Sequence, residues 1–195
     1  MNLTDLLVPT YRNMLRTLLG LLDKAEAQLG AEEAEGLLSA RLAPDMFPLA
    51  TQIRFAVLQV FDGVRHLRGE PWTAELDAIV AEGRTAGENP GTLAAARARV
   101  EQALAHIDRL DAGALDGEPE DAPLVLELPD GRMFDLTRGQ FARDWALGQF
   151  YFHIMASYAI LRKEGVEIGK ADYVPHMFPY IRPGTCRLAN SHARR

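Results

Sequence analysis

Apolar residues recur along the first part of the chain with the spacing of one face of an α-helix. Over residues 4–29 they fall at intervals of three and four positions, and Gly30 follows as a typical helix stop. The same spacing returns over residues 48–68, which end before Gly69 and Pro71. The pattern therefore predicts two long amphipathic helices.

The segments that follow these helices are predicted to be connections. Residues 31–46 are expected to hold a short helix at 31–40 and then a loop, because prolines disfavour helical backbone in the residue before them. Residues 70–91 are expected to form a long crossover with a short helix at 73–81. A crossover of this length lets the helices on either side lie parallel or antiparallel.

Two further helices are predicted in the second half of the chain. Thr92 is a suitable N-cap for a helix over residues 92–110, and Thr137 with Gln140 forms a capping box for a helix over residues 137–165. In this last helix Phe141, Trp145, Phe152, Ala156 and Ile160 are expected on one face, with Phe150, Tyr151 and Tyr158 on the opposite face.

A β-hairpin is predicted at about residues 124–136. Two apolar runs flank Asp130-Gly131 there, a pair of residues typical of a tight turn between strands. Residues 166–195 contain prolines and aromatic side chains and are expected to form an irregular tail that wraps the bundle. The predicted fold class is all-α, a four-helix bundle with long crossovers and one small β-hairpin, in one domain over residues 1–195.

The composition of the chain excludes several classes of partner and cellular location. The chain has 195 residues and a net charge of −6, which argues against a nucleic-acid partner. It has one cysteine, Cys186, so an intrachain disulfide is impossible. No signal peptide and no apolar run of the ~20 residues needed to cross a bilayer are apparent. We therefore expect a soluble, cytoplasmic protein without a membrane partner.

His153 is the leading candidate for a functional residue. It lies in residues 149–161, which are apolar on almost every face, so the helix is predicted to be buried on more than one side. Metal sites on bundle helices usually pair two histidines four positions apart. The residues four positions away are Gln149 and Ser157, which are poor ligands for a transition metal. A hydrogen-bonded core or interface histidine is favoured, with a polar pocket as the alternative.

Other candidate residues carry weaker signals. Asp45 precedes the second helix and is expected to cap it, or else to supply a pocket carboxylate. His66 and His106 are expected to be solvated residues at helix edges. No nucleophile elbow, phosphate loop or dinucleotide fingerprint is present, so no catalytic residue is predicted.

Three segments resemble one bacterial family. They are residues 42–48 (Leu-Ala-Pro-Asp-Met-Phe-Pro), 149–153 (Gln-Phe-Tyr-Phe-His) and 165–173 (Gly-Val-Glu-Ile-Gly-Lys-Ala-Asp-Tyr). They are similar to an uncharacterised domain-of-unknown-function family of the DinB/YfiT-like four-helix-bundle superfamily, a group of proposed metalloenzymes. The resemblance extends from the first helix to about residue 180.

The resemblance implies a four-helix bundle, often dimeric. It also implies three histidine ligands in the members that bind metal, one on the second helix and an His-x-x-x-His pair on the last. In this chain His153 matches the second histidine of that pair and Gln149 the first, while Gln52 lies at about the helix-two position. A degenerate metal site is therefore predicted, with no metal and no cofactor.

The leading prediction is an uncharacterised, non-catalytic DinB-like bundle protein that has lost the metal triad, with small-ligand binding as its expected role. Gln52, Gln149 and His153, together with Asp45, are expected to form a polar pocket for a small molecule or water. An alternative is a metal-dependent transferase or hydrolase that uses His153 with Asp45 or His176. The other alternative is a homodimeric interaction protein without a catalytic site, in which the last helix is the interface.

Overall fold

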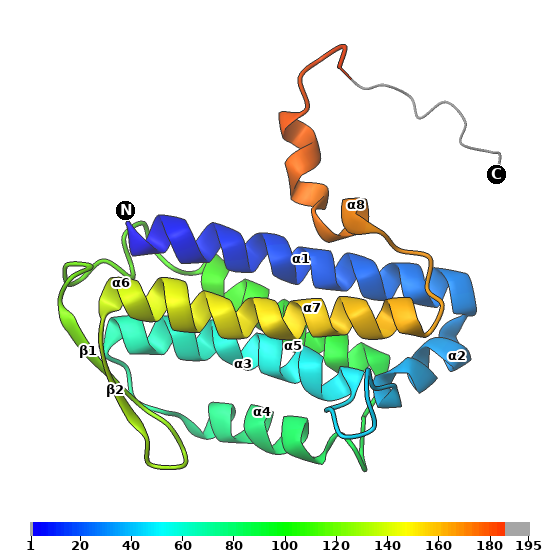
Figure 1. The fold of residues 1–195 in the computed structure, drawn as a ribbon, viewed down its shortest axis with the longest axis horizontal. Coiled ribbons are helices and arrows are strands. Elements are labelled where there is room, and N and C mark those ends of the chain that lie inside the picture. Colours follow the sequence, from blue (N-terminus) through cyan, green and yellow to red (C-terminus); the bar gives the residue numbers. More distant parts are fainter. Residues whose placement is uncertain (1, 186–195) are drawn as a thin grey trace.

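The computed structural model describes residues 2–185, and most of them are helical (Figure 1). The first half contains α1 (Leu3–Leu29), α2 (Ala31–Gly36), the 3₁₀ turn η1 (Leu37–Ser39), α3 (Leu49–Arg68), α4 (Ala74–Thr85) and α5 (Leu93–Asp108). The second half contains β1 (Pro123–Glu127), β2 (Met133–Thr137), α6 (Arg138–Gln140), the π-helical η2 (Phe141–Ala146), α7 (Leu147–Lys163), α8 (Lys170–Tyr173) and the 3₁₀ segment η3 (Pro175–Tyr180).

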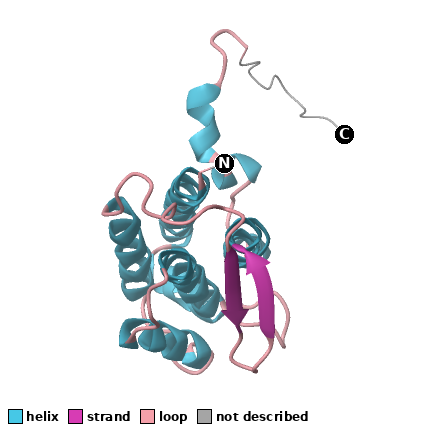
Figure 2. Ribbon diagram, turned by 90° about the vertical axis from the view of Figure 1, so that its left-hand side faces the viewer, coloured by secondary structure: helices cyan, strands magenta, loops and turns pink. Residues whose placement is uncertain are grey.

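The four long helices α1, α3, α5 and α7 lie side by side as a bundle (Figures 1 and 2). Helix α3 is central, because it packs against α4, α5 and α7. The apolar faces of all four long helices meet in one core, which includes Tyr11, Leu18, Ile53, Val57, Val100, Ile107, Phe150 and Ile154. The predicted fold class, a DinB-like helical bundle with a small hairpin, is confirmed.

Local signals set most helix ends. Gly69 adopts a left-handed backbone, with φ of 65°, and ends α3. The hydroxyl of Thr92 accepts a hydrogen bond from the backbone N–H of Ala95 and caps α5, and the predicted capping box of Thr137 and Gln140 is formed. These ends agree with the sequence prediction because each depends on residues close together in the chain.

The predicted hairpin is also present. Strands β1 and β2 are antiparallel, with Leu124 opposite Leu136, and Gly131 has a φ of 84° in the turn between them. The hairpin lies along the bundle, as Figure 2 shows, with Leu126 buried and Phe134 against Trp145. These contacts stabilise a pair of strands that would be marginal alone.

The last predicted helix differs from a regular α-helix. Residues 141–146 are π-helical, and a π turn accommodates an extra residue, which shifts the inward face by about one position. As a result Phe150 is fully buried, and Phe152 is 56% exposed. The expected inner position of Phe152 and the expected availability of Phe150 on the outer face are both wrong.

The C-terminal segment follows the bundle only in part. Val166 and Ile168 are buried, and α8 packs on α1, where Lys24 pairs with Asp172. The segment over residues 175–185 then projects away from the bundle (Figures 1 and 2), so the expectation that the whole tail wraps the bundle is wrong there. Residues 186–195, including Cys186, lie outside the described part of the chain.

None of the helices within residues 2–185 combines the length and the apolar character that a membrane span requires. A cytoplasmic location stays a prediction.

Candidate functional site

The packing of α3 against α7 brings Gln52 and His153 into contact. The Nδ1 atom of His153 lies 2.8 Å from Oε1 of Gln52, and Nε2 of Gln52 donates to the carbonyl of Phe47 at 3.3 Å. The second bond orients the amide, so its oxygen accepts from the histidine. We therefore assign the proton of His153 to Nδ1, which leaves a lone pair on Nε2.

Burial keeps His153 uncharged. Its side chain is enclosed between α3 and α7, with 8% of the residue exposed, and burial lowers its pKa from 6.5 to about 4. The rings of Phe55 and Phe152 lie 5.6 and 5.2 Å from the imidazole, both edge to face. At neutral pH this histidine is a weak base and a neutral hydrogen-bond partner.

The second ring nitrogen of His153 is available. Nε2 has no hydrogen-bond partner among residues 2–185, and 8% of the residue is exposed. Phe152, which contacts the imidazole, and Phe47, which contacts Phe55, are both exposed. The amide of Gln52 holds the imidazole in one orientation, and aromatic rings flank it, so Nε2 is an acceptor with a fixed direction. Neighbouring groups orient histidines in the same way at binding sites.

The other predicted site residues are less involved. Gln149 is half-buried one turn before His153 and makes no side-chain hydrogen bond within residues 2–185. Asp45 is exposed in the turn before α3, whose N-cap position is Pro48 without a side-chain cap. The expected capping role of Asp45 is therefore wrong, because the prolines place the carboxylate outside the first turn. The structure joins Gln52 and His153, whereas Asp45 makes no hydrogen bond or ion pair with either of them.

The residues near His153 do not fit a metal held by three side chains. Within residues 2–185 no group of three or more histidine, cysteine, aspartate or glutamate side chains could hold a metal ion. Gln52 uses its oxygen to accept from His153, so it is not a free ligand. His176, the other ligand considered, lies in the projecting η3.

Two other histidines differ from expectation. His66 is mostly enclosed beside Asp62 and packs on Phe141. His106 packs on Phe61 at 4.7 Å, and burial lowers its pKa. Both are only partly exposed, because each ring packs against a phenylalanine ring of the bundle.

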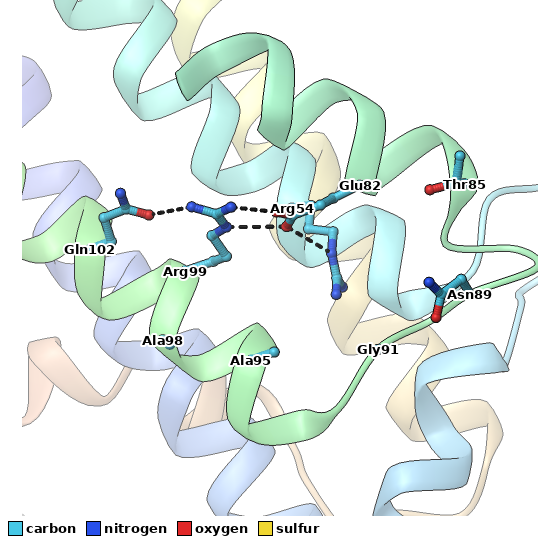
Figure 3. Close-up of a pocket in the computed structure, with 9 residues that line it drawn as sticks. All are labelled: Arg54, Glu82, Thr85, Asn89, Gly91, Ala95, Ala98, Arg99 and Gln102. Carbon is cyan, nitrogen blue, oxygen red and sulfur yellow. Dashed lines mark hydrogen bonds and ion pairs between the residues drawn. The ribbon is translucent and has the colours of Figure 1, made fainter. Parts of the chain in front are cut away.

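A second polar site, which the sequence did not predict, lies between α3, α4 and α5. Arg54 on α3 and Arg99 on α5 both approach Glu82 on α4, beside a cavity of about 460 Å³ (Figure 3). The available signal was Arg54 itself, a charge next to Ile53 on the apolar stripe of α3. A charged residue at such a position is either paired or functional.

The bundle, its long crossovers and its hairpin define a DinB-like helical protein. The chain is similar to the crystal structure of a DinB family member protein from Shewanella denitrificans, with 32% identity, a TM-score of 0.73, and coverage of 93% of this chain and 96% of that one. The family model "Domain of unknown function (DUF1993)" matches residues 3–174, so the chain belongs to this family. No curated protein matches it.

Proposed function

We propose that this DinB-like protein binds a small neutral molecule at His153. The observation that carries the proposal is the oriented imidazole, whose Nδ1–H donates to Gln52 while Nε2 has no hydrogen-bond partner within residues 2–185. A neutral acceptor between the rings of Phe55 and Phe152 suits a planar or apolar ligand with one N–H or O–H donor. Phenol and indole have this chemistry and serve as probes.

The test follows the ring nitrogens of His153 by nitrogen-15 NMR during titration with phenol or indole. Binding should shift the Nε2 signal of His153 saturably and leave the signals of His106 in place. The His153→Gln variant should lose probe binding, and His106→Gln, which alters a half-buried histidine on α5, should retain it. A probe that binds both variants equally would contradict the proposal.

A metal-dependent transferase or hydrolase is the less favoured alternative, because the residues around His153 do not provide a three-ligand set. Purified protein incubated with zinc or nickel and then desalted tests it directly. Stoichiometric metal that is lost in His153→Gln would replace the small-molecule proposal with the metal-dependent one.

We also propose a homodimer through α7, on a separate observation. Tyr151, Phe152 and Met155 are exposed large apolar side chains on one stretch of this helix. Contiguous apolar surface of this kind is typical of interaction sites. Sedimentation should show a dimer that Met155→Glu converts to a monomer, while Met133→Glu, on the exposed hairpin, leaves the dimer intact. A monomeric wild-type protein would exclude this interface.

A further inference from the structure

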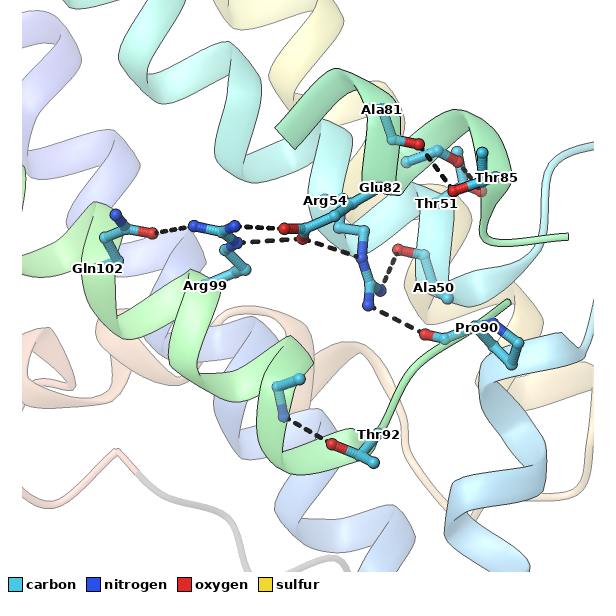
Figure 4. Close-up of polar contacts among 12 residues, drawn as sticks. Ala50, Thr51, Arg54, Ala81, Glu82, Thr85, Pro90, Thr92, Arg99 and Gln102 are labelled. Atoms are coloured by element: carbon cyan, nitrogen blue, oxygen red, sulfur yellow. Dashed lines mark hydrogen bonds and ion pairs between the residues drawn. The ribbon is translucent and has the colours of Figure 1, made fainter. Parts of the chain in front are cut away.

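Arg54 is a buried cation with unused donors. Only 4% of the residue is exposed. One terminal nitrogen donates to the carbonyl of Ala50 and the other to that of Pro90, each at 3.0 Å (Figure 4). Its Nε atom is enclosed and has no hydrogen bond, although it lies 3.6 Å from Glu82. A guanidinium has five N–H groups, so the two carbonyls satisfy a minority of them.

Glu82 does not neutralise this site alone. Both oxygens of its carboxylate are engaged by Arg99, with one bond of 3.1 Å from Nε of Arg99 and a second from a terminal nitrogen. The hydrogen bond from Arg99 is the main reason that the pKa of Glu82 is lowered. Two arginines therefore share the carboxylate of Glu82. The charge of Glu75 acts on Arg99, so Arg54 is the arginine without a carboxylate of its own beside the cavity.

The cavity next to Arg54 has a size suited to a small molecule. Its volume of about 460 Å³ lies within the ~300–1,000 Å³ typical of ligand pockets. Figure 3 shows Arg99, Arg54 and Asn89 among the residues that line the cavity, with Asn89 on the side of Arg54 away from Arg99. Gly91 allows the crossover to come close, since a Cβ there would lie 2.8 Å from a terminal nitrogen of Arg54.

We propose that this cavity binds a small organic anion through a carboxylate or phosphate group that pairs with Arg54. The fork of a guanidinium matches both groups. A purely structural ion pair needs one cation for one carboxylate, whereas here the second cation is buried and only partly compensated, an arrangement that an anion stabilises. Asn89, exposed at the rim, supplies an amide to the polar remainder of the ligand.

The site is separate from the region around His153. Arg54 follows Gln52 by two positions, which places the two side chains about 200° apart around α3, since each helical residue turns ~100°. Gln52 meets α7, and Arg54 meets α4 and the crossover at Pro90. An anion at Arg54 can therefore be bound or absent without altering the proposed small-molecule site.

The test uses isothermal titration of the full chain with inorganic phosphate and, separately, with succinate. Asn89→Asp adds a negative charge at the rim and should weaken binding about tenfold, the effect of a like charge inside a partly shielded cavity. Gln149→Glu is the matched control, because it adds the same charge on α7 outside the cavity lining, and it should leave the affinity unchanged. Arg54→Lys should abolish binding while circular dichroism shows a folded bundle.

Each outcome decides the proposal. Saturable binding of either anion that Asn89→Asp weakens and Gln149→Glu does not supports it, and the anion that binds more tightly identifies phosphate or carboxylate as the preferred group. Failure of the wild-type protein to bind either anion overturns it. An equal loss in the two charge variants also overturns it, since that result shows a non-specific charge effect. If Arg54→Lys does not fold, the Asn89 and Gln149 pair still decides.

Discussion

The two sides of α3 differ in the charge of the polar groups that they bury. Toward α7, Gln52 and His153 form an uncharged hydrogen bond among aromatic rings. Toward α4 and α5, Arg54 remains charged beside Glu82 and a cavity. A neutral pair is stable when it is enclosed, because each partner satisfies the hydrogen-bonding group of the other. A buried cation needs an anion beside it, and therefore space for that anion. One helix thus supports a neutral site on one side and a cationic site on the other.

The largest expected effect is the pH dependence that His153 contributes. Its pKa is about 4 in the folded protein and near 6.5 when exposed, so between these values the unfolded chain binds more protons. Stability should therefore fall as the pH decreases from 6.5 to 4, by roughly 3 kcal/mol from this residue.

Urea unfolding at pH 7 and pH 4 measures this loss. In His153→Gln, the free energy of unfolding should lose the part of its pH dependence that is due to His153. It should retain the part due to His106, whose pKa is also lowered by burial. Identical pH profiles of the variant and the wild-type protein would show that His153 is not enclosed as described.

Removal of the partner of His153 should have the next largest effect. Gln52→Ala leaves a buried N–H unpaired, which costs about 2 kcal/mol. Gln149→Ala removes the same side-chain type where it makes no hydrogen bond within residues 2–185, and its effect should stay below about 0.5 kcal/mol. Urea unfolding of both variants at pH 7 compares them, and similar losses would mean that the Gln52 bond is unimportant.

On the other side of α3, Glu82→Gln should destabilise the bundle by roughly 1–2 kcal/mol, a value below that of a fully buried pair because Glu82 is partly exposed. The comparison variant is Glu26→Gln, which breaks a surface pair with Arg97 and should cost at most about 0.5 kcal/mol. Thermal unfolding with and without phosphate measures both, and phosphate should restore part of the loss only in Glu82→Gln.

The smallest expected effect comes from Gly83, which lies against the ring of Phe55. A Cβ at Gly83 of α4 would lie 2.4 Å from the ring of Phe55, which packs against His153. Gly83→Ala should cost about 1 kcal/mol net of its gain in helix propensity. Gly20→Ala meets nothing within 4 Å and should stabilise α1 by about 0.5–1 kcal/mol. Thermal unfolding of the pair isolates the contact, and equal gains would show that the Phe55 ring moves freely.

Several elements could be predicted because their causes are local. Thr137 and Gln140 are three residues apart, and Asp130-Gly131 makes a turn wherever two strands flank it. The shifted face of α7 could not be predicted, since the π segment at 141–146 depends on how the bundle accommodates an extra residue. The contact of Gln52 with His153 was anticipated through the family resemblance, and the structure supplies its geometry.

The sequence by itself determined the number of long helices, the hairpin and the all-α fold, because hydrophobic period, caps and turn residues act within a few positions of the chain. Only the tertiary structure decided that Phe150 lies in the core while Phe152 is exposed, that Asp45 does not cap α3, and that Arg54 meets Glu82. These outcomes depend on the relative rotation of packed helices. A shift of one residue turns a helix face by ~100°, and no local signal records that angle.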